Sequence, residues 1–112
     1  MNVFEKIVSR QIPADIVYED ALALAFRDVN PVAPVHVLVI PKRSVARLGD
    51  TSDADRELLG HLLSVCRIVA EREGIAASGY RVVTNNGGDG GQSVDHLHLH
   101  VLGGRAMRWP PG

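Results

Sequence analysis

The sequence predicts an α+β domain with a mostly antiparallel five-stranded sheet, one long helix and a short N-terminal helix. Apolar residues recur at helical spacing over residues 53–73, whereas β-branched or alternating apolar runs occupy 35–40 and 94–102. The connections between the predicted strands are too short for the crossovers of a doubly wound parallel sheet. With 112 residues, the chain is long enough for a single domain, 1–112, with its own hydrophobic core.

The first third of the chain predicts a short helix followed by a hairpin. Helical spacing of apolar residues favours a helix over 2–9, and Pro13 follows it. Two neighbouring apolar segments, 16–20 and 22–27, then predict paired strands. Residues 28–34 hold two prolines and an asparagine, which is typical of a loop.

The middle of the chain predicts a central strand and the long helix. Residues 35–40 form a near-continuous β-branched run that Pro41 ends. Ser52 or Asp53 is suited to cap the helix over 53–73, and Gly74 to stop it. The apolar stripe of this helix comprises Leu59, Leu62, Leu63, Cys66, Val69 and Ala70, widened by Leu58 and Val65. A stripe of this width predicts one side packed on the sheet and another on a partner helix.

The last third predicts two strands joined by a glycine-rich loop. Residues 80–84 form the first strand, and 85–92 contain four glycines and predict the loop. Residues 94–102 alternate between polar and apolar side chains, which predicts the last strand.

Composition and charge exclude several classes of function. The net charge of −1 provides no basic field for a nucleic-acid backbone. The single cysteine, Cys66, forms no internal disulfide and supplies no Cys-x-x-Cys zinc ligands, so we expect a small buried side chain. The start of the chain resembles no signal peptide, and no apolar run approaches a membrane span. We therefore expect a soluble cytoplasmic protein without a membrane partner.

Three histidines stand at alternate positions in the last predicted strand. His96, His98 and His100 therefore share one face, about 6.6 Å apart at about 3.3 Å of rise per residue. The intervening apolar residues belong against the long helix. Imidazoles at this spacing are suited to bind a zinc ion, or one of them to act as a nucleophile that carries a transferred group.

The loop before this strand favours the nucleophile. Residues 85–93 offer many unhindered backbone N–H groups, which form anion-binding nests, and Gln92 and Ser93 add side-chain donors. A phosphate site beside a nucleophile explains both features. A metal site calls for carboxylate or thiolate support, and only Asp89 and Asp95 lie near.

Residues 96–102 resemble the histidine-triad pattern, His-φ-His-φ-His-φ-φ with φ apolar, at every position. The resemblance covers nearly the whole chain, including 90–94 (GGQSV) and 36–42 (HVLVIPK). The ending, 103–112 (GGRAMRWPPG), resembles the branch called histidine triad nucleotide-binding proteins, or Hint.

The Hint resemblance implies a homodimer whose two sheets join into one. It also implies hydrolysis of purine nucleoside 5′-phosphoramidates and acyl-adenylates through a nucleotidyl-histidine, with release of the nucleoside monophosphate and without metal or cofactor. Two alternatives stay open. One is a dinucleoside polyphosphate hydrolase, and the other is a zinc- or nucleotide-binding regulatory module with negligible catalysis.

By position, the resemblance assigns a role to each site residue. His98 is the nucleophile, and the backbone carbonyl of His96 holds its ring. His100 and Ser93 stabilise the phosphate charge, and His36 packs beside His96. The further nucleotide-binding residues are Asp28 for the ribose hydroxyls, Asn85, Gly91, Gln92 and Val94 around the phosphate, and Ile7, Ile12, Phe26, Val29 and Leu38 with Phe4 around the base. Trp109 is expected to reach the leaving-group side of the partner subunit.

The sequence departs from the family pattern at three places. Asp95 stands where an aromatic residue is frequent, and we expect it to affect packing rather than chemistry. Arg27 stands where histidine is common, beside the expected ribose site. Some branches bind zinc through two cysteines near the N-terminus, but this chain has Asn2 and Glu5 there, which predicts no such zinc site.

Overall fold

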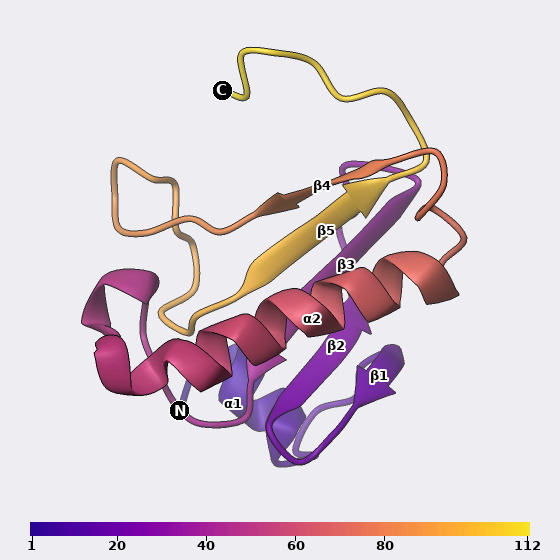
Figure 1. Ribbon diagram of the computed structural model, residues 1–112. Coiled ribbons are helices and arrows are strands. Elements are labelled where there is room, and N and C mark those ends of the chain that lie inside the picture. Colours follow the sequence, from indigo (N-terminus) through magenta and orange to yellow (C-terminus); the bar gives the residue numbers. More distant parts are fainter.

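The computed structural model describes all residues, 1–112, and forms one antiparallel sheet with a helix on each face (Figure 1). The strand order is β1-β2-β3-β5-β4. The strands are β1 (Ile16–Glu19), β2 (Ala23–Arg27), β3 (Val35–Pro41), β4 (Tyr80–Val83) and β5 (Leu99–Gly103). The helices are α1 (Val3–Val8) and α2 (Arg56–Arg72), with short 3-10 helices at Leu48–Asp50 and Asp53–Asp55. The predicted α+β class is therefore confirmed.

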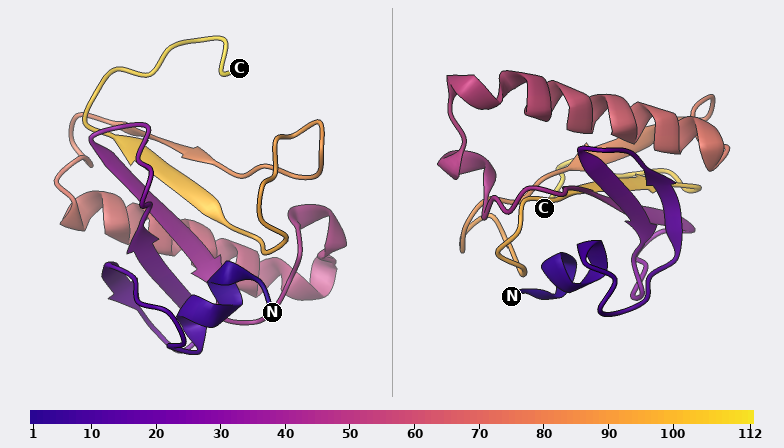
Figure 2. Two further views of the ribbon diagram at one scale, coloured as in Figure 1. Left: turned by 180° about the vertical axis from the view of Figure 1, so that it is seen from behind. Right: turned by 90° about the horizontal axis from the view of Figure 1, so that it is seen from below.

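The two faces of the sheet are buried by different helices. Figure 2 shows α2 on one side of the sheet and the short α1 on the other. Fourteen buried residues, among them Leu62, Val69, Leu97 and Val101, form the core between the sheet and α2. Six more form a second core on the face toward α1: Phe4, Ile7, Leu24, Phe26, Leu38 and Ile40. Because both faces of β2 and β3 are covered, these strands lack the alternation of a half-exposed strand.

The long helix begins later than the sequence predicts. Residues 53–55 form a 3-10 turn, in which the Ser52 hydroxyl accepts a hydrogen bond from the N–H of Ala54. The α-helix proper starts at Arg56, and its predicted apolar stripe faces the sheet except for Leu63, which is exposed. Cys66 lies in this core as expected, and burial raises the pKa of its thiol to about 12. No helix of the structure is both long and apolar enough to cross a membrane.

The hairpin of β1 and β2 is fastened to α2 through Asp20. One carboxylate oxygen accepts the backbone N–H groups of Leu22 and Ala23, and the other lies 2.7 Å from the Tyr18 hydroxyl and 2.6 Å from Nε2 of His61. Burial raises the pKa of Asp20, but these hydrogen bonds outweigh it and lower the pKa to about 2. The carboxylate therefore stays ionised and holds the turn on the helix.

The last strand is shorter than predicted: β5 begins at Leu99, and residues 94–98 lie outside the sheet. The β5 ladder with β3 stops at the Val39–Leu99 pair although β3 runs on to Pro41, and β4 ends at Val83, so the preceding residues have no ladder partner. Other groups bind this backbone instead; the N–H of Leu97 donates to the carbonyl of Val45. The alternation nevertheless persists, because Leu97 packs in the α2 core and His96 and His98 pack against Phe4 on the other side.

Candidate active site

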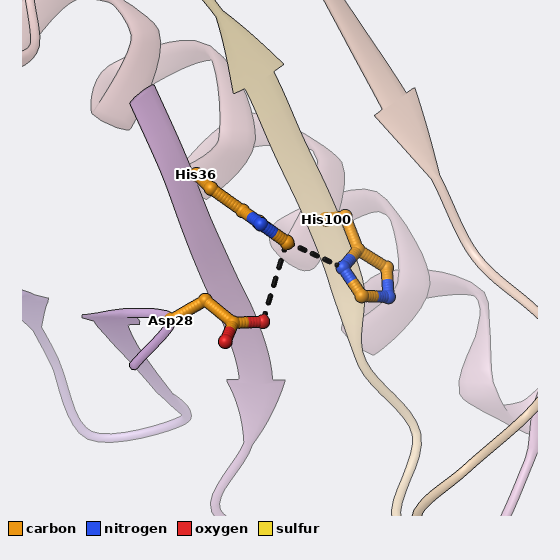
Figure 3. Close-up of side chains that lie close together, drawn as sticks. All are labelled: Asp28, His36 and His100. Carbon is orange, nitrogen blue, oxygen red and sulfur yellow. Dashed lines mark hydrogen bonds and ion pairs between the residues drawn. The ribbon is translucent and has the colours of Figure 1, made fainter. Parts of the chain in front are cut away.

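The candidate site lies on the sheet face away from α2, where β3 and β5 run side by side. The register pairs Leu38 with His100 and His36 with Leu102, so His36 and His100 are diagonal neighbours on one face. Figure 3 shows their rings converging with the carboxylate of Asp28, which follows β2. Three separate segments therefore supply this cluster.

His98 is held as one tautomer. Its Nδ1 lies 2.6 Å from the backbone carbonyl oxygen of His96. A carbonyl oxygen only accepts, so Nδ1 carries the proton and Nε2 of the neutral ring keeps its lone pair. The ring is 3% exposed and stands edge-on to Phe4 and His100, each with a centroid separation of 5.1 Å. In its neutral form, His98 thus presents Nε2 as the unprotonated nitrogen of a fixed ring.

His96 lies apart from this cluster. Its Nε2 lies 2.9 Å from the carbonyl oxygen of Pro41, which fixes the proton on Nε2, and its buried Nδ1 has no hydrogen-bond partner. The side chain ties residues 94–98 to the end of β3. The expectation that His36 packs beside His96 is wrong: His36 packs beside His100, with ring centroids 5.1 Å apart, because the β3–β5 register brings those two together.

The protons in the Asp28–His36–His100 cluster follow from the backbone. The N–H of Val32 donates to Nδ1 of His36 over 3.1 Å, so the proton of the neutral His36 ring is on Nε2. That nitrogen lies 2.9 Å from Nδ1 of His100 and 3.4 Å from Oδ2 of Asp28. His100 Nδ1 therefore accepts, and His100 Nε2 carries a proton. This Nε2 is buried and has no partner in the protein, so it is a free donor.

Both rings of the cluster are neutral at neutral pH. Burial, together with smaller effects of the neighbouring His98 and His36, lowers the pKa of His100 to about 4 against the opposing effect of Asp28. Burial also lowers the pKa of His36, against the opposing effect of Asp28. The cluster is thus a chain of neutral hydrogen-bonding rings that ends in a carboxylate.

This shift predicts a stability loss on acidification. The ordinary histidine pKa is 6.5, so as the pH falls the unfolded chain binds a proton at position 100 before the folded chain does. The contribution of His100 to the free energy of unfolding is expected to fall between pH 6.5 and about 4 and then to level off. His100→Asn should reduce this slope in urea denaturation at a series of pH values. An unchanged slope would contradict the assignment.

A cavity of about 350 Å³ opens beside His98 and gathers the predicted base-binding residues. Its volume is within the range of small-molecule sites. Its apolar wall comprises Val3, Phe4, Ile7, Ile12, Pro13, Ala14, Phe26, Val29, Leu38 and Val94, and its polar end comprises Asp28, Asn30, Ser93, His98 and His100, with Arg27 at the edge. The cavity is therefore apolar on one side and polar on the other, as a ligand with an apolar ring and a charged group requires.

The glycine loop is braced by side chains rather than left open. Gln92 accepts the N–H of Gly87 and donates to the carbonyls of Ala46 and Val94, so both of its amide protons are used within the protein. Asn86, which the sequence analysis did not select, accepts the N–H of Gly49 over 2.7 Å. Gln92 therefore lies in the predicted region, but its amide holds the loop.

Asn85, Gly91 and Trp109, which are also predicted site residues, lie outside the first cavity. Asn85 lines a second cavity, of about 990 Å³, that shares Asp28 and His100 with the first, whereas Gly91 lines neither. Gly91 has φ +79° and allows the turn into Gln92. Trp109 is 82% exposed, and its ring lies 5.9 Å from the guanidinium carbon of Arg81 in the same chain.

The two departures near the site lie away from the histidine cluster. The guanidinium of Arg27 donates to Asp15 and makes a two-point contact with Glu73 at the end of α2, so it is engaged there and not beside Asp28. Asp95 is exposed and lies 3.6 Å from Arg47, so it has no part in the core. The expected packing effect of Asp95 therefore has no structural basis.

The Asp28–His36–His100 cluster is also the one group of side chains arranged as metal ligands, with one ligand atom of each residue within 4.8 Å of the others. Its hydrogen bonds do not fit a metal. The only nitrogen that His36 directs into the cluster is Nε2, which bears the proton because Nδ1 accepts from Val32. A metal ligand needs a lone pair at that position.

The comparisons with known proteins agree with the fold. The HIT domain family model matches residues 9–107. An uncharacterized HIT-like protein of Synechococcus elongatus is 57% identical over 111 residues, which cover 99% of this chain and 96% of the relative. The 14 kDa zinc-binding protein of Zea mays is 52% identical over 113 residues, which cover 99% of this chain and 88% of the relative.

A solved structure of a similar protein has the same fold as this chain. The crystal structure of a HIT family hydrolase from Legionella pneumophila superposes with a TM-score of 0.96 at 50% identity, covering 98% of each chain. The sheet and its two helices are thus those of a HIT domain. The chain belongs to the HIT family.

Proposed function

We propose that this chain is a nucleotide-binding hydrolase that acts through a nucleotidyl intermediate on His98. Its proposed substrates are purine nucleoside 5′-phosphoramidates, whose P–N bond it cleaves, and acyl-adenylates. The observation that carries the proposal is the state of His98. Its Nδ1 is bound by the His96 carbonyl, so the lone pair of the neutral ring is on Nε2, and the ring lines the apolar cavity beside His100. A nucleophilic imidazole needs these properties.

The reaction takes place in two displacements at phosphorus. In the first, the lone pair of His98 Nε2 forms an N–P bond while the bond to the leaving nitrogen breaks; that nitrogen keeps the electron pair and takes a proton from water. In the second, water attacks phosphorus, its proton returns to solvent, and the N–P pair returns to Nε2. The net reaction consumes one water and releases an amine and a nucleoside monophosphate. Two easier displacements replace one difficult one.

The neighbouring groups complete the proposed site. The unpartnered N–H at Nε2 of His100 and the Ser93 hydroxyl are donors for the phosphate oxygens, where charge builds up during each displacement. Asp28 accepts the N–H of Asn30 through Oδ1 and retains lone pairs for the ribose hydroxyls. The apolar wall, with Phe26, Ile7 and Leu38, is suited to one flat base.

The test is release of AMP from an adenosine 5′-phosphoramidate, with and without a chelator. We expect turnover at the same rate in both conditions, because the tautomer of His36 opposes metal binding in the cluster. Loss of activity with chelator, restored by zinc, would favour the zinc-dependent alternative that the name of the maize relative suggests. Faster cleavage of a dinucleoside polyphosphate would favour that class of substrate instead.

We also propose that the protein works as a homodimer with one continuous sheet. The β4 edge, Tyr80–Val83, has no strand beyond it, and Leu63 on the neighbouring α2 is 56% exposed. The opposite edge is protected: β1 has a register irregularity, and its Glu19 pairs with Arg10 and Lys42. Sedimentation is expected to give twice the 12.1 kDa chain mass. A species of 12.1 kDa alone would contradict the dimer.

A further inference from the structure

The segment that carries the proposed nucleophile is held by side chains instead of a sheet ladder. Residues 94–98 lie outside the sheet and make one backbone-to-backbone hydrogen bond, from the N–H of Leu97 to the carbonyl of Val45. Their other hydrogen-bonded carbonyls accept from side chains: Val94 from Gln92, Asp95 from Asn2, His96 from His98, and His98 from Thr84. The position of His98 therefore depends on identifiable side-chain donors.

One of these donors acts on the peptide group of His98 itself. The hydroxyl of Thr84 donates to the His98 carbonyl over 2.9 Å, and the two residues are 14 positions apart in the chain. Thr84 directly follows β4, and in Figure 1 the chain runs from the end of β4 through the glycine loop and back to the start of β5. The Thr84 hydroxyl thus joins the two ends of this loop at the nucleophile.

The strand register explains why a side chain makes this contact. The β4–β5 ladder ends at the pair Val83–His100, and one further step would pair Thr84 with Leu99. The ladder does not take that step, so His98 lies one residue before β5 and no backbone N–H binds its carbonyl. A carbonyl in a buried residue requires a donor, and the hydroxyl of Thr84 supplies it.

We propose that Thr84 is a positioning residue for the nucleophile: its hydroxyl fixes the peptide group of His98, and through it the contact of His98 Nδ1 with the His96 carbonyl. The inference rests on the proposed function, because it concerns the nucleophile of that reaction. His98 is anchored at its ring by the His96 carbonyl and at its own carbonyl by Thr84. Since β5 holds the chain from Leu99 onward, a rotation of this peptide group displaces His98 and not the strand.

Thr84 acts through His98 and does not touch the ligand. It lines neither the cavity beside His98 nor the larger cavity that shares Asp28 and His100 with it. Its contact is made within one chain and needs no exposed surface, so it is compatible with a partner subunit at the β4 edge. We therefore expect its loss to lower kcat and to leave KM nearly unchanged.

The experiment removes the hydroxyl and keeps the shape of the side chain. Thr84→Val retains the β-branched form, whereas Thr84→Ser retains the hydroxyl and loses the methyl group. A displacement of about 1 Å in a catalytic site can cost 10²-fold, and a smaller one is expected here. With an adenosine 5′-phosphoramidate, Thr84→Val should lower kcat about tenfold with KM within about twofold of the wild type. Thr84→Ser should restore the wild-type kcat.

A second readout does not depend on turnover. Nitrogen-15 NMR distinguishes the protonated from the unprotonated nitrogen of the His98 ring, at about pH 9, where an ordinary imidazole is neutral. For the wild type we expect a protonated Nδ1 and an unprotonated Nε2. In Thr84→Val the two shifts should move toward each other as the other tautomer becomes populated. Thr84→Ser should give the wild-type pattern, and the spectrum of His98→Asn assigns the signals.

Thr51→Val is the matched control. Thr51 is the other threonine of the chain, and its hydroxyl also donates to a backbone carbonyl, that of Leu48 over 2.8 Å, outside both cavities. Its kcat and its His98 shifts should equal those of the wild type. Circular dichroism verifies that each variant folds. If Thr84→Val does not fold, the comparison of Thr84→Ser with Thr84→Ala tests the same hydroxyl.

The outcomes separate this inference from the proposed function. A folded Thr84→Val with the wild-type kcat, with unchanged ring shifts, or with a loss that Thr84→Ser shares overturns the role of Thr84 and leaves the hydrolase intact. A wild type that cleaves no phosphoramidate overturns the hydrolase. The ring shifts then decide by themselves whether Thr84 positions His98.

Discussion

Replacement of His98 by alanine is expected to lower AMP release from an adenosine phosphoramidate by a factor on the order of 10⁴ or more. The change removes Nε2, the nitrogen proposed to attack phosphorus. No other ring can replace it: the free nitrogen of His100 carries a proton, and His96 lies outside the cavity. Initial rates at saturating substrate measure the effect.

Two further measurements separate lost chemistry from lost structure. His98→Asn keeps a side-chain N–H for the His96 carbonyl and should be equally inactive while binding AMP, as calorimetry can show. Quenching of the wild type in alkaline denaturant during turnover, which preserves a P–N bond to imidazole, should reveal by mass spectrometry one nucleotidyl group on the peptide that contains His98. A His98→Ala protein with a tenth of the wild-type rate would exclude the covalent mechanism.

The second large effect is expected at Gly90, in the loop that precedes Ser93. A Cβ at this position would lie 2.4 Å from the carbonyl oxygen and 2.8 Å from the nitrogen of Asn86. Both are backbone atoms, so Gly90→Ala must move the loop itself. Because a displacement of about 1 Å in a catalytic site can cost 10²-fold, we expect kcat to fall about 10²-fold. The loop is on the surface, so the melting temperature should change little.

Gly88→Ala is the matched control. It adds the same methyl group to the same loop, but no atom lies within 4 Å of that Cβ, and the backbone does not have a positive φ. Its kcat should equal that of the wild type. If Gly90→Ala also retained the wild-type kcat, the loop would have no part in positioning the reacting groups.

Much of the fold follows from local patterns. Apolar periodicity identified α2, the β-branched run identified β3, and the alternation of residues 97–101 correctly assigned its apolar side chains to the α2 core. The residue at which β5 begins could not be predicted from local patterns. Whether residues 94–98 join the sheet depends on pairing with a neighbouring strand, and the ladder with β3 stops at Val39–Leu99 while β4 ends at Val83.

For the site too, some features could be predicted from the sequence and others could not. The family pattern directed attention to His98, to the apolar cavity residues and to His36. The partner of His36 was misassigned, since it depends on the β3–β5 register, which no local pattern specifies. Gln92 was correctly associated with the loop, but its three backbone contacts come from residues 46, 87 and 94, which only the folded chain brings together.

By itself, the sequence determined the α+β class, the histidine triad and the glycine loop before it, because each depends on residues that are close along the chain. Only the tertiary structure decided the protons and the charges. The tautomers of His36, His98 and His100 are set by backbone groups and by pairing across strands. Distance in space, rather than distance in sequence, governs electrostatics and hydrogen bonding.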